Sequence, residues 1–308
     1  MLLKTSSDVR PACATFGHWS VLSNARCDSP NIENAGKNVS GSVLEQSPEA
    51  IAAAALGVGV GAIVSAERIK HGLTNDSWGV RTERDAVIVR LSNTAEELLQ
   101  IDRASEARVL EIAAGAGIGP EVLVCDPQRH VLVTRDLGRT WAQEDAHVPA
   151  NIVRLARVLS KLHSLAAPKE VRAVDLIETM RGYLVALEQH GRNTHATSKR
   201  MRERGEHAAL ALRQDGRVCL CHNDVHHLNV VDRGSIRLID WEYSGIGEPM
   251  FDLASVCVYH RYDRYEREHL MEAYLERTDS SALQRLDLAC WLFEYIRELW
   301  MEVRAEMP

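Results

Sequence analysis

The residues best suited to chemistry lie in two neighbouring segments, residues 222–231 and 238–242. Asp224 is followed by Asn229, and a second acid, Asp240, ends the next apolar run. One carboxylate can act as a base, while the other two side chains offer oxygen ligands to a divalent cation. Mg²⁺ takes a few such oxygens together with substrate phosphates. Phosphoryl transfer needs this equipment, because the protein there mainly positions the nucleophile and neutralises developing charge.

Zinc binding is an alternative interpretation of the same region. Cys219, Cys221, His222, His226 and His227 cluster in the sequence, and two of the histidines have i, i+4 spacing. The zincin motif, however, requires Glu directly after the first His and a helical setting, whereas this segment is expected to be a loop. A Cys-x-Cys pair on a strand also places both thiols on one face, most simply a buried one. The pattern therefore disfavours zinc.

Two groups of elements would have to position these residues. Between Ala62 and Val133 the sequence predicts short strands at residues 63–70, 78–82, 86–91, 122–125 and 131–135, with one helix at 96–116. After Gly138 it predicts helices at residues 151–166, 175–190, 197–214, 265–276 and 281–305, and two short apolar runs at 217–221 and 236–239. An α+β protein with two lobes around a cleft is expected.

The predicted lobes divide the chain into residues 49–138, with the strands, and residues 139–308, mainly helical. Ser47, Pro48 and Glu49 read as an N-cap, a first-turn proline and a first-turn acid that open a short helix, which Gly57 would end. Residues 1–48 are rich in Ser, Asn, Asp and Gly without a sustained period, so we expect a mobile or peripherally docked extension.

Composition excludes several classes of protein. The chain has 45% hydrophobic and 26% charged residues, as globular chains do, and 36 basic against 43 acidic residues give a formal charge of −7. Nucleic-acid binding normally needs a basic footprint, so we do not expect it. The longest uncharged stretch, residues 50–64, is shorter than the roughly 18–20 apolar residues of a membrane span. Seven scattered cysteines predict a reducing compartment, and we expect a cytoplasmic protein.

The motifs resemble those of the aminoglycoside phosphotransferase and choline kinase branch of the protein-kinase-like fold. The family's His-x-Asp-x-x-x-x-Asn pattern is matched by His222, Asp224 and Asn229, and its metal-binding Asp pattern by residues 239–242. Residues 247–254, Gly-Glu-Pro-Met-Phe-Asp-Leu-Ala, look like its Gly-Asp-Pro-x-x-Asp-Leu-Ala stretch. The resemblance implies a two-lobed kinase-like enzyme that uses ATP and Mg²⁺.

It also implies roles for individual residues. Asp224 would be the base or orienter of the substrate hydroxyl, with Asn229 and Asp240 as Mg²⁺ ligands. His222 would brace the catalytic loop, and Asp252 would anchor it by buried hydrogen bonds. Nucleotide binding falls to seven residues of the small lobe and its connector: Thr74, Asn75, Arg90, Glu106, Thr134, Asp136 and Leu137. Among these, Glu106 would orient Arg90 on the phosphates, and adenine would lie against the connector.

The expected acceptor is a small cationic alcohol, as in choline, ethanolamine or thiamine kinases. Aromatic faces and a carboxylate attract quaternary ammonium groups, and the candidates are Trp241, Glu242, Tyr243, Trp291 and Tyr295. The last two are also explained by ordinary core packing on a helix. Aminoglycoside phosphorylation is an alternative, with an acidic surface at Glu266, Glu268, Glu272 and Glu276. A non-catalytic nucleotide-binding module is a further alternative, which the presence of all three site residues disfavours.

Overall fold

The computed structural model describes residues 47–69, 75–92, 96–214, 216–277 and 279–307. The extension predicted for residues 1–48 therefore falls outside the described residues, apart from Ser47 and Pro48. These two residues begin helix α1 (Pro48–Leu56) as predicted, because the Ser47 side chain accepts a hydrogen bond from Ala50 N and Gly57 ends the helix at φ +68°. Among the described residues, no helix combines the length and apolar character needed to cross a bilayer.

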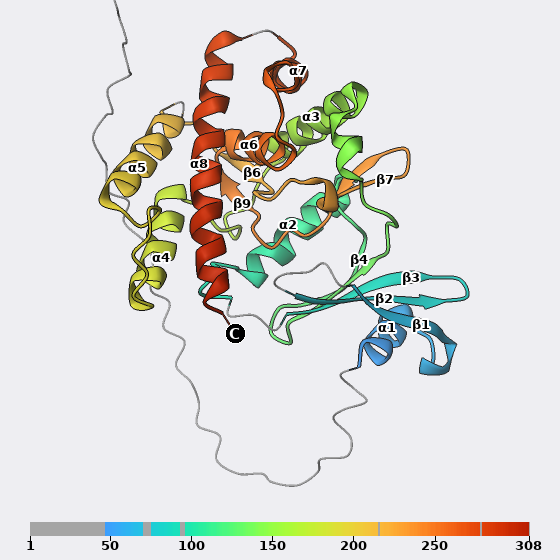
Figure 1. The fold of residues 1–308 in the computed structure, drawn as a ribbon. Helices are drawn as coiled ribbons and strands as arrows, with labels where there is room; N and C mark the ends of the chain where they lie inside the picture. Colours follow the sequence, from blue (N-terminus) through green and yellow to red (C-terminus); the bar gives the residue numbers. More distant parts are fainter. Residues whose placement is uncertain (1–46, 70–74, 93–95, 215, 278, 308) are drawn as a thin grey trace, which may run out of the picture.

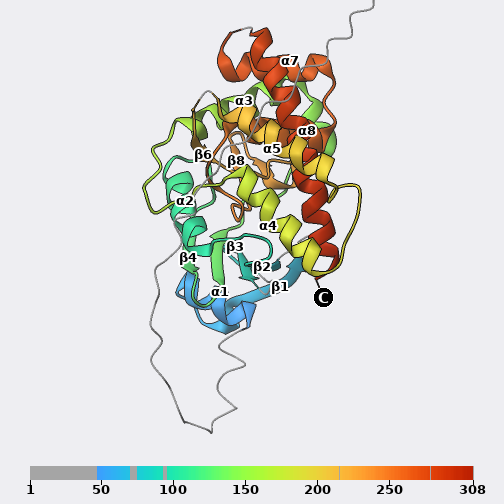
Figure 2. The ribbon, with the colours of Figure 1, turned by 90° about the vertical axis from the view of Figure 1, so that its left-hand side faces the viewer.

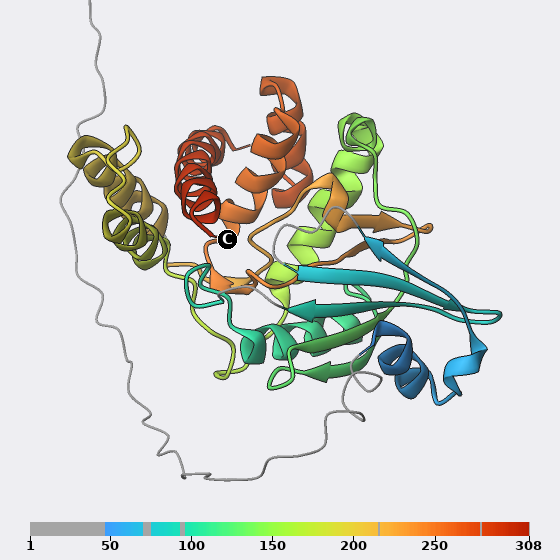
Figure 3. The same cartoon turned by 60° about the horizontal axis from the view of Figure 1, so that its bottom comes forward.

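A five-stranded antiparallel sheet forms the small lobe, with strand order β1-β2-β3-β5-β4 (Figure 1). Val87 and Val89 point to one face of the sheet, where they form a separate small core with Val80, Val133 and Ala52 of α1. Helix α1 covers this face (Figure 3). The strands are β1 (Ile63–Ile69), β2 (Asn75–Thr82), β3 (Ala86–Ser92), β4 (Val122–Asp126) and β5 (Val131–Arg135).

Helix α2 (Arg103–Gly115) lies between the sheet and the helical lobe, in contact with β4 and β9 (Figure 1). The sequence predicted a helix from residue 96, and this start is wrong. Gln100 adopts a left-handed conformation with φ +56°, which interrupts the helix. Asp102 then caps α2 by accepting a hydrogen bond from Ser105 N.

The described residues of the larger lobe form six helices, with α8, a helix of 26 residues, running through the lobe (Figures 1 and 2). Helices α4 and α5 pack on one side of α8, α6 packs against another, and α3 pairs with α7. The α3 stripe of Ile152, Leu155, Ala156, Leu159 and Leu162 is buried at helical spacing. The helices are α3 (Pro149–Ser164), α4 (Leu176–Gln189), α5 (Lys199–Arg213), α6 (Pro249–His260), α7 (Arg264–Leu275) and α8 (Ser280–Ala305). The α+β, two-lobed prediction is confirmed.

Helix α6 was not predicted as a helix. Its residues are buried almost all round, from Pro249 through Cys257, so the segment lacks the alternation of apolar and polar residues that reveals an amphipathic helix. This helix matters for function because it carries Asp252 and faces the catalytic loop.

Two short pairs of antiparallel strands carry the loops of interest. Strand β6 (Cys219–Cys221) pairs with β9 (Gly245–Gly247), and β7 (Val230–Asp232) pairs with β8 (Ile236–Leu238). Residues 222–229 leave the end of β6, and residues 239–244 follow β8. The two loops therefore lie side by side, and Ile239 N donates to Asn229 O across them at 3.0 Å.

Candidate active site

Asp252 anchors the loop that follows β6. This fully buried carboxylate accepts hydrogen bonds from His222 N at 2.9 Å and from Asn223 N at 2.5 Å. It also contacts His163 Nε2 at 3.0 Å, and the other ring nitrogen of His163 contacts the Tyr274 hydroxyl at 2.8 Å. Two adjacent amides held by one carboxylate fix the direction in which the loop leaves the strand.

His222 braces the loop from inside as a neutral imidazole. Its Nδ1 accepts a hydrogen bond from Asp224 N at 3.3 Å, so its Nε2 carries the proton and donates to Ile239 O at 3.0 Å. Burial lowers the pKa of His222, which keeps the ring uncharged. The ring also packs on Trp241, with centroids 4.6 Å apart.

Asp224 presents its carboxylate to the cleft with three neighbours. Tyr259 donates its hydroxyl to one oxygen at 2.8 Å, while Asn229 Nδ2 and His226 Nε2 lie 3.2 Å and 3.5 Å from the other. Burial raises the pKa of Asp224, but the contacts with His226 and Tyr259 outweigh it and hold the pKa below its usual value. The group is therefore an ionised acceptor at neutral pH.

Tyr259 is a site residue that the sequence did not reveal. It lies on the same face of α6 as Asp252, two helical turns further on, so one helix holds both the loop and its carboxylate. Predicting α6 as a helix would have exposed this relation. The neighbouring residue, His260, accepts a hydrogen bond at its Nε2 from His227 N, 3.1 Å away. This bond holds the far end of the loop against α6.

The oxygens needed for a divalent cation come together beside Asp224. Asn229 uses its amide nitrogen to bond Asp224, which leaves its Oδ1 as the ligand atom. The Asp240 side chain is 39% exposed, and one of its oxygens lies 3.6 Å from Arg90 Nη1. Desolvation and the nearby Glu242 raise the pKa of Asp240 well above its usual range. A bound divalent cation would offset this crowding of negative charge, so the residues fit Mg²⁺.

Arg90 and Glu106 form a buried bidentate pair. Nη1 and Nη2 of Arg90 each lie 2.7 Å from one Glu106 oxygen, and Nη1 lies 3.6 Å from Asp240. Burial lowers the pKa of Arg90, but the Glu106 carboxylate outweighs it and holds this pKa above its usual value. The pair places a guanidinium next to the proposed metal ligand, where phosphates would be neutralised.

A second guanidinium, Arg103, joins this pair to the rest of the site, and no sequence motif indicated it. Its Nη1 donates to Glu106 at 2.9 Å and to Glu242 at 3.1 Å, and its Nη2 donates to Asn75 Oδ1 at 2.8 Å. Asn75 Nδ2 in turn donates to Glu242 at 2.7 Å. We call Asn75, Arg90, Arg103, Glu106 and Glu242 the interlobe network, because it joins β2, β3 and α2 to the loop after β8.

This network changes the interpretation of two predicted acceptor residues. Glu242 is 2% exposed and engaged by Arg103 and Asn75, so it does not present a bare carboxylate to a ligand. Trp241 is 1% exposed beneath His222, with its Nε1 donating to Leu238 O. Tyr243 differs, since its half-buried hydroxyl accepts from Trp300 Nε1 at 2.9 Å.

The two acceptor residues predicted on α8, Trp291 and Tyr295, lie on a face of that helix other than the one nearest Asp224. Tyr295 is buried and donates to Ala196 O, and Trp291 stacks on it under the Arg204 guanidinium. Both pack toward α5, as ordinary core packing on a helix also explains, and their contact with the acceptor stays a prediction. A different face of α8 lies on the side of Asp224 and Tyr243. It carries Phe293, Arg297 and Trp300, at spacing i, i+4 and i+7.

The remaining predicted nucleotide residues are placed as follows. Thr74 lies outside the described residues, whereas Thr134 is buried in β5. The Asp136 side chain accepts a hydrogen bond from Gly138 N at 2.7 Å, and the backbone amide of Asp136 donates one to Ala86 O. These bonds shape the connector that also contains Leu137. Contact of these residues with adenine stays a prediction.

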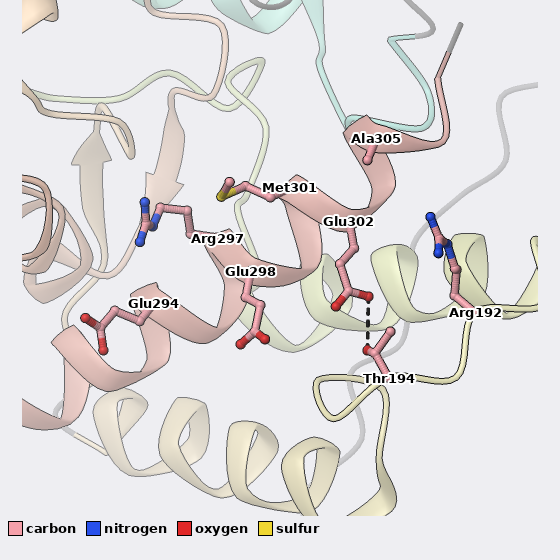
Figure 4. A pocket seen from close by; sticks show the side chains of 8 residues that line it. All are labelled: Arg192, Thr194, Glu294, Arg297, Glu298, Met301, Glu302 and Ala305. Atoms are coloured by element: carbon pink, nitrogen blue, oxygen red, sulfur yellow. Dashed lines mark hydrogen bonds between the residues drawn. The ribbon is translucent and has the colours of Figure 1, made fainter.

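The acids of α7 do not converge on the site. Glu266 caps its own helix and contacts His147, and Glu268 pairs with Arg264. A cavity of about 650 Å³ lies along α8 instead (Figure 4). Its lining comprises Arg192, Thr194, Glu294, Arg297, Glu298, Met301, Glu302 and Ala305.

Glu248 gives a pH-dependent prediction. Burial raises the pKa of Glu248 to about 7, and the positive charge of Arg213 offsets only part of this rise. The Oε1 atom of Glu248 has no hydrogen-bond partner among the described residues. Between the unfolded value, about 4.3, and about 7 the unfolded chain ionises first, so stability falls as pH rises.

Glu248→Gln should therefore raise the free energy of unfolding by about 1–2 kcal/mol at about pH 8 and change it little at about pH 4. Each pKa unit corresponds to about 1.4 kcal/mol, and water in the adjoining pocket screens part of the charge. Urea unfolding at the two pH values measures this. Glu203→Gln, an exposed α5 acid, is the control. An equal gain at both pH values would contradict the assigned pKa.

The chain matches the phosphotransferase enzyme family over residues 65–288. This span runs from within β1 into α8 and includes the two loops that carry Asp224, Asn229 and Asp240. It covers more than half of the chain, and the chain therefore belongs to this family.

Within the family, the chain is similar to choline and ethanolamine kinases. Ethanolamine kinase 2 of Rattus norvegicus is 27% identical over 203 residues, which cover 62% of this chain and 52% of that protein. Protein LicA of Haemophilus influenzae is 25% identical over 248 residues, or 76% and 72% of the two chains. The crystal structure of a choline/ethanolamine kinase family protein from Mesorhizobium loti superposes with a TM-score of 0.65 at 26% identity, over 85% of this chain and 84% of that one. The fold is the two-lobed, protein-kinase-like one.

Proposed function

We propose that this protein transfers the γ-phosphoryl group of ATP, with Mg²⁺, to the hydroxyl of a small amino alcohol, as choline and ethanolamine kinases do. The observation that carries the proposal is the Asp224 carboxylate, ionised and oriented by Tyr259, beside the oxygens of Asn229 and Asp240. Similarity to kinases of such alcohols supports the choice of acceptor.

On the acceptor side, Asp224 would accept a hydrogen bond from the substrate hydroxyl and aim its oxygen at the phosphorus. A strong base is not required, because phosphoryl transfer proceeds through a loose transition state. The lowered pKa of Asp224 suits an orienting acceptor better than a strong base. Its fixed position, set by Tyr259 and by the loop amides on Asp252, supplies the alignment.

On the nucleotide side, Arg90 would neutralise phosphate oxygens while Glu106 holds the guanidinium in place. Asn229 and Asp240 would hold Mg²⁺, which when bound draws negative charge from the phosphate oxygens. The connector with Asp136 and Leu137 would meet the adenine.

A cytoplasmic location agrees with the five free cysteines among the described residues.

Release of ADP over a panel of alcohols tests the proposal. The panel contains ethanolamine, choline, thiamine and an aminoglycoside, each with and without EDTA. We expect turnover on an amino alcohol that disappears with EDTA and returns with added Mg²⁺. Preference for thiamine or the aminoglycoside would replace the acceptor class and keep the chemistry. ATP binding without turnover on any alcohol would contradict the enzyme and favour a nucleotide-binding module.

A further inference from the structure

One cation on the acceptor side of the site has no part in the proposed chemistry. Arg297 projects from α8 so that its guanidinium carbon lies 5.7 Å from the centre of the Tyr259 ring. The hydroxyl of that same ring donates to Asp224. Arg297 therefore lies one side chain away from the group that would orient the acceptor hydroxyl.

This guanidinium is incompletely satisfied. Its Nε is buried and has no hydrogen-bond partner, and within the described part of the chain no acid lies within ion-pair distance of Arg297. Glu294 and Glu298 are its neighbours along α8 and line the same cavity, but their carboxylates point away from its guanidinium (Figure 4). A guanidinium without an acidic partner favours a ligand that supplies acceptor oxygens to its outer nitrogens.

The position of the Arg297 charge favours an acceptor that carries an anionic group as well as its hydroxyl. The Arg297 guanidinium already faces the Tyr259 ring, which is the kind of aromatic surface that an ammonium group would use. The neighbouring Glu242 carboxylate is taken up by the interlobe network. Near Asp224 the acceptor side therefore offers a positive charge and aromatic edges.

We propose that Arg297 binds an oxyanion group of the acceptor, a carboxylate or a phosphate, while Asp224 binds its hydroxyl. The inference rests on the proposed function, since it assumes an alcohol acceptor, and it narrows the class to alcohols that carry a negative charge beside the hydroxyl. A guanidinium fork suits both oxyanions, because it donates two parallel hydrogen bonds.

Matched pairs of acceptors test the role of Arg297. L-Serine and ethanolamine differ by a carboxylate, as do L-homoserine and 3-aminopropan-1-ol, and glycerol 3-phosphate and glycerol differ by a phosphate. We expect the wild-type protein to prefer the anionic member of at least one pair. Arg297→Met should reduce that preference about 10–100-fold, mostly through KM, because a charged hydrogen bond is lost. Arg297→Lys should restore part of it.

The pairs separate recognition from support. If Arg297 only braces Tyr259, kcat/KM falls equally for both members of a pair, which would overturn the inference. Arg264→Met, which removes an exposed guanidinium of α7, should leave the ratios unchanged. Wild-type turnover without preference for any anionic member would also overturn the inference, yet it would leave the proposed function standing.

Equilibrium binding covers the case in which nothing turns over. Calorimetry of L-serine, L-homoserine and glycerol 3-phosphate with the full chain and ADP would then decide the matter. Binding that Arg297→Met abolishes supports the oxyanion site even though the proposed function has failed. Lack of binding by all three compounds overturns it.

Discussion

Replacement of Asp224 by Asn should remove nearly all turnover and leave ATP binding intact. The amide is nearly isosteric and keeps one oxygen to accept from Tyr259, and Asn229 Nδ2 keeps its hydrogen bond to the backbone oxygen of residue 224, so the loop should hold its shape. It loses the negative charge that accepts and aligns the substrate hydroxyl. Loss of such a group costs about 10²–10⁴-fold in rate. ADP release at saturating acceptor and calorimetric ATP binding measure the two quantities.

The matched control is Asp287→Asn, which removes an exposed acid that pairs with Arg267 far from the loop. It should leave both quantities unchanged. Wild-type turnover in Asp224→Asn would show that Asp224 is not the orienting group. Joint loss of turnover and ATP binding would instead assign the carboxylate to the nucleotide side.

Arg103→Met should lower the free energy of unfolding by about 3–5 kcal/mol, because removing one partner of a buried ionic network leaves uncompensated charge. Arg103 is 7% exposed and contacts Glu96, Glu106 and Glu242. Without it, two buried carboxylates lose a donor and Asn75 loses the donor to its oxygen. The midpoint and slope of urea unfolding, followed by circular dichroism, give the change.

Arg108→Met provides the contrast on the same helix. Arg108 and its partner Glu111 are both more than half exposed, and such a surface pair contributes about 0–1 kcal/mol. Arg103→Lys keeps the charge without the planar fork, so its stability should fall between those of the wild type and Arg103→Met. Equal stability of the Arg103→Met and Arg108→Met proteins would contradict the interlobe network.

The loop of the candidate site could be predicted because its possible catalytic residues lie at short, local spacing. Asp224, Asn229 and Asp240 fall within one stretch, and alternation and period marked the strands of the small lobe and most of the helices. The five-stranded sheet followed the predicted runs closely, since its small core leaves a clear difference between inner and outer residues.

The parts of the site that the sequence did not predict depend on contacts between segments that are far apart in the chain. Arg103 meets Glu242, and Tyr259 meets Asp224, across separations of 139 and 35 residues. Helix α6 was missed since it is buried all round, and Tyr259 was missed with it. Trp291 and Tyr295 were assigned to the acceptor by residue type, yet helix rotation turns them toward α5. Residue type alone does not determine which face a long helix presents.

The depth of the interlobe network determines how the protein responds to ionic strength. Dissolved ions screen exposed charges over about 8–10 Å at ordinary salt, but they have little access to pairs from which water is excluded. The exposed pairs Arg108–Glu111 and Arg264–Glu268 lose their attraction as salt rises, whereas the buried pair of Arg103 in the small lobe and Glu242 in the large lobe keeps its attraction. The two lobes therefore stay joined by charge in concentrated salt, where charge attraction at the protein surface has faded.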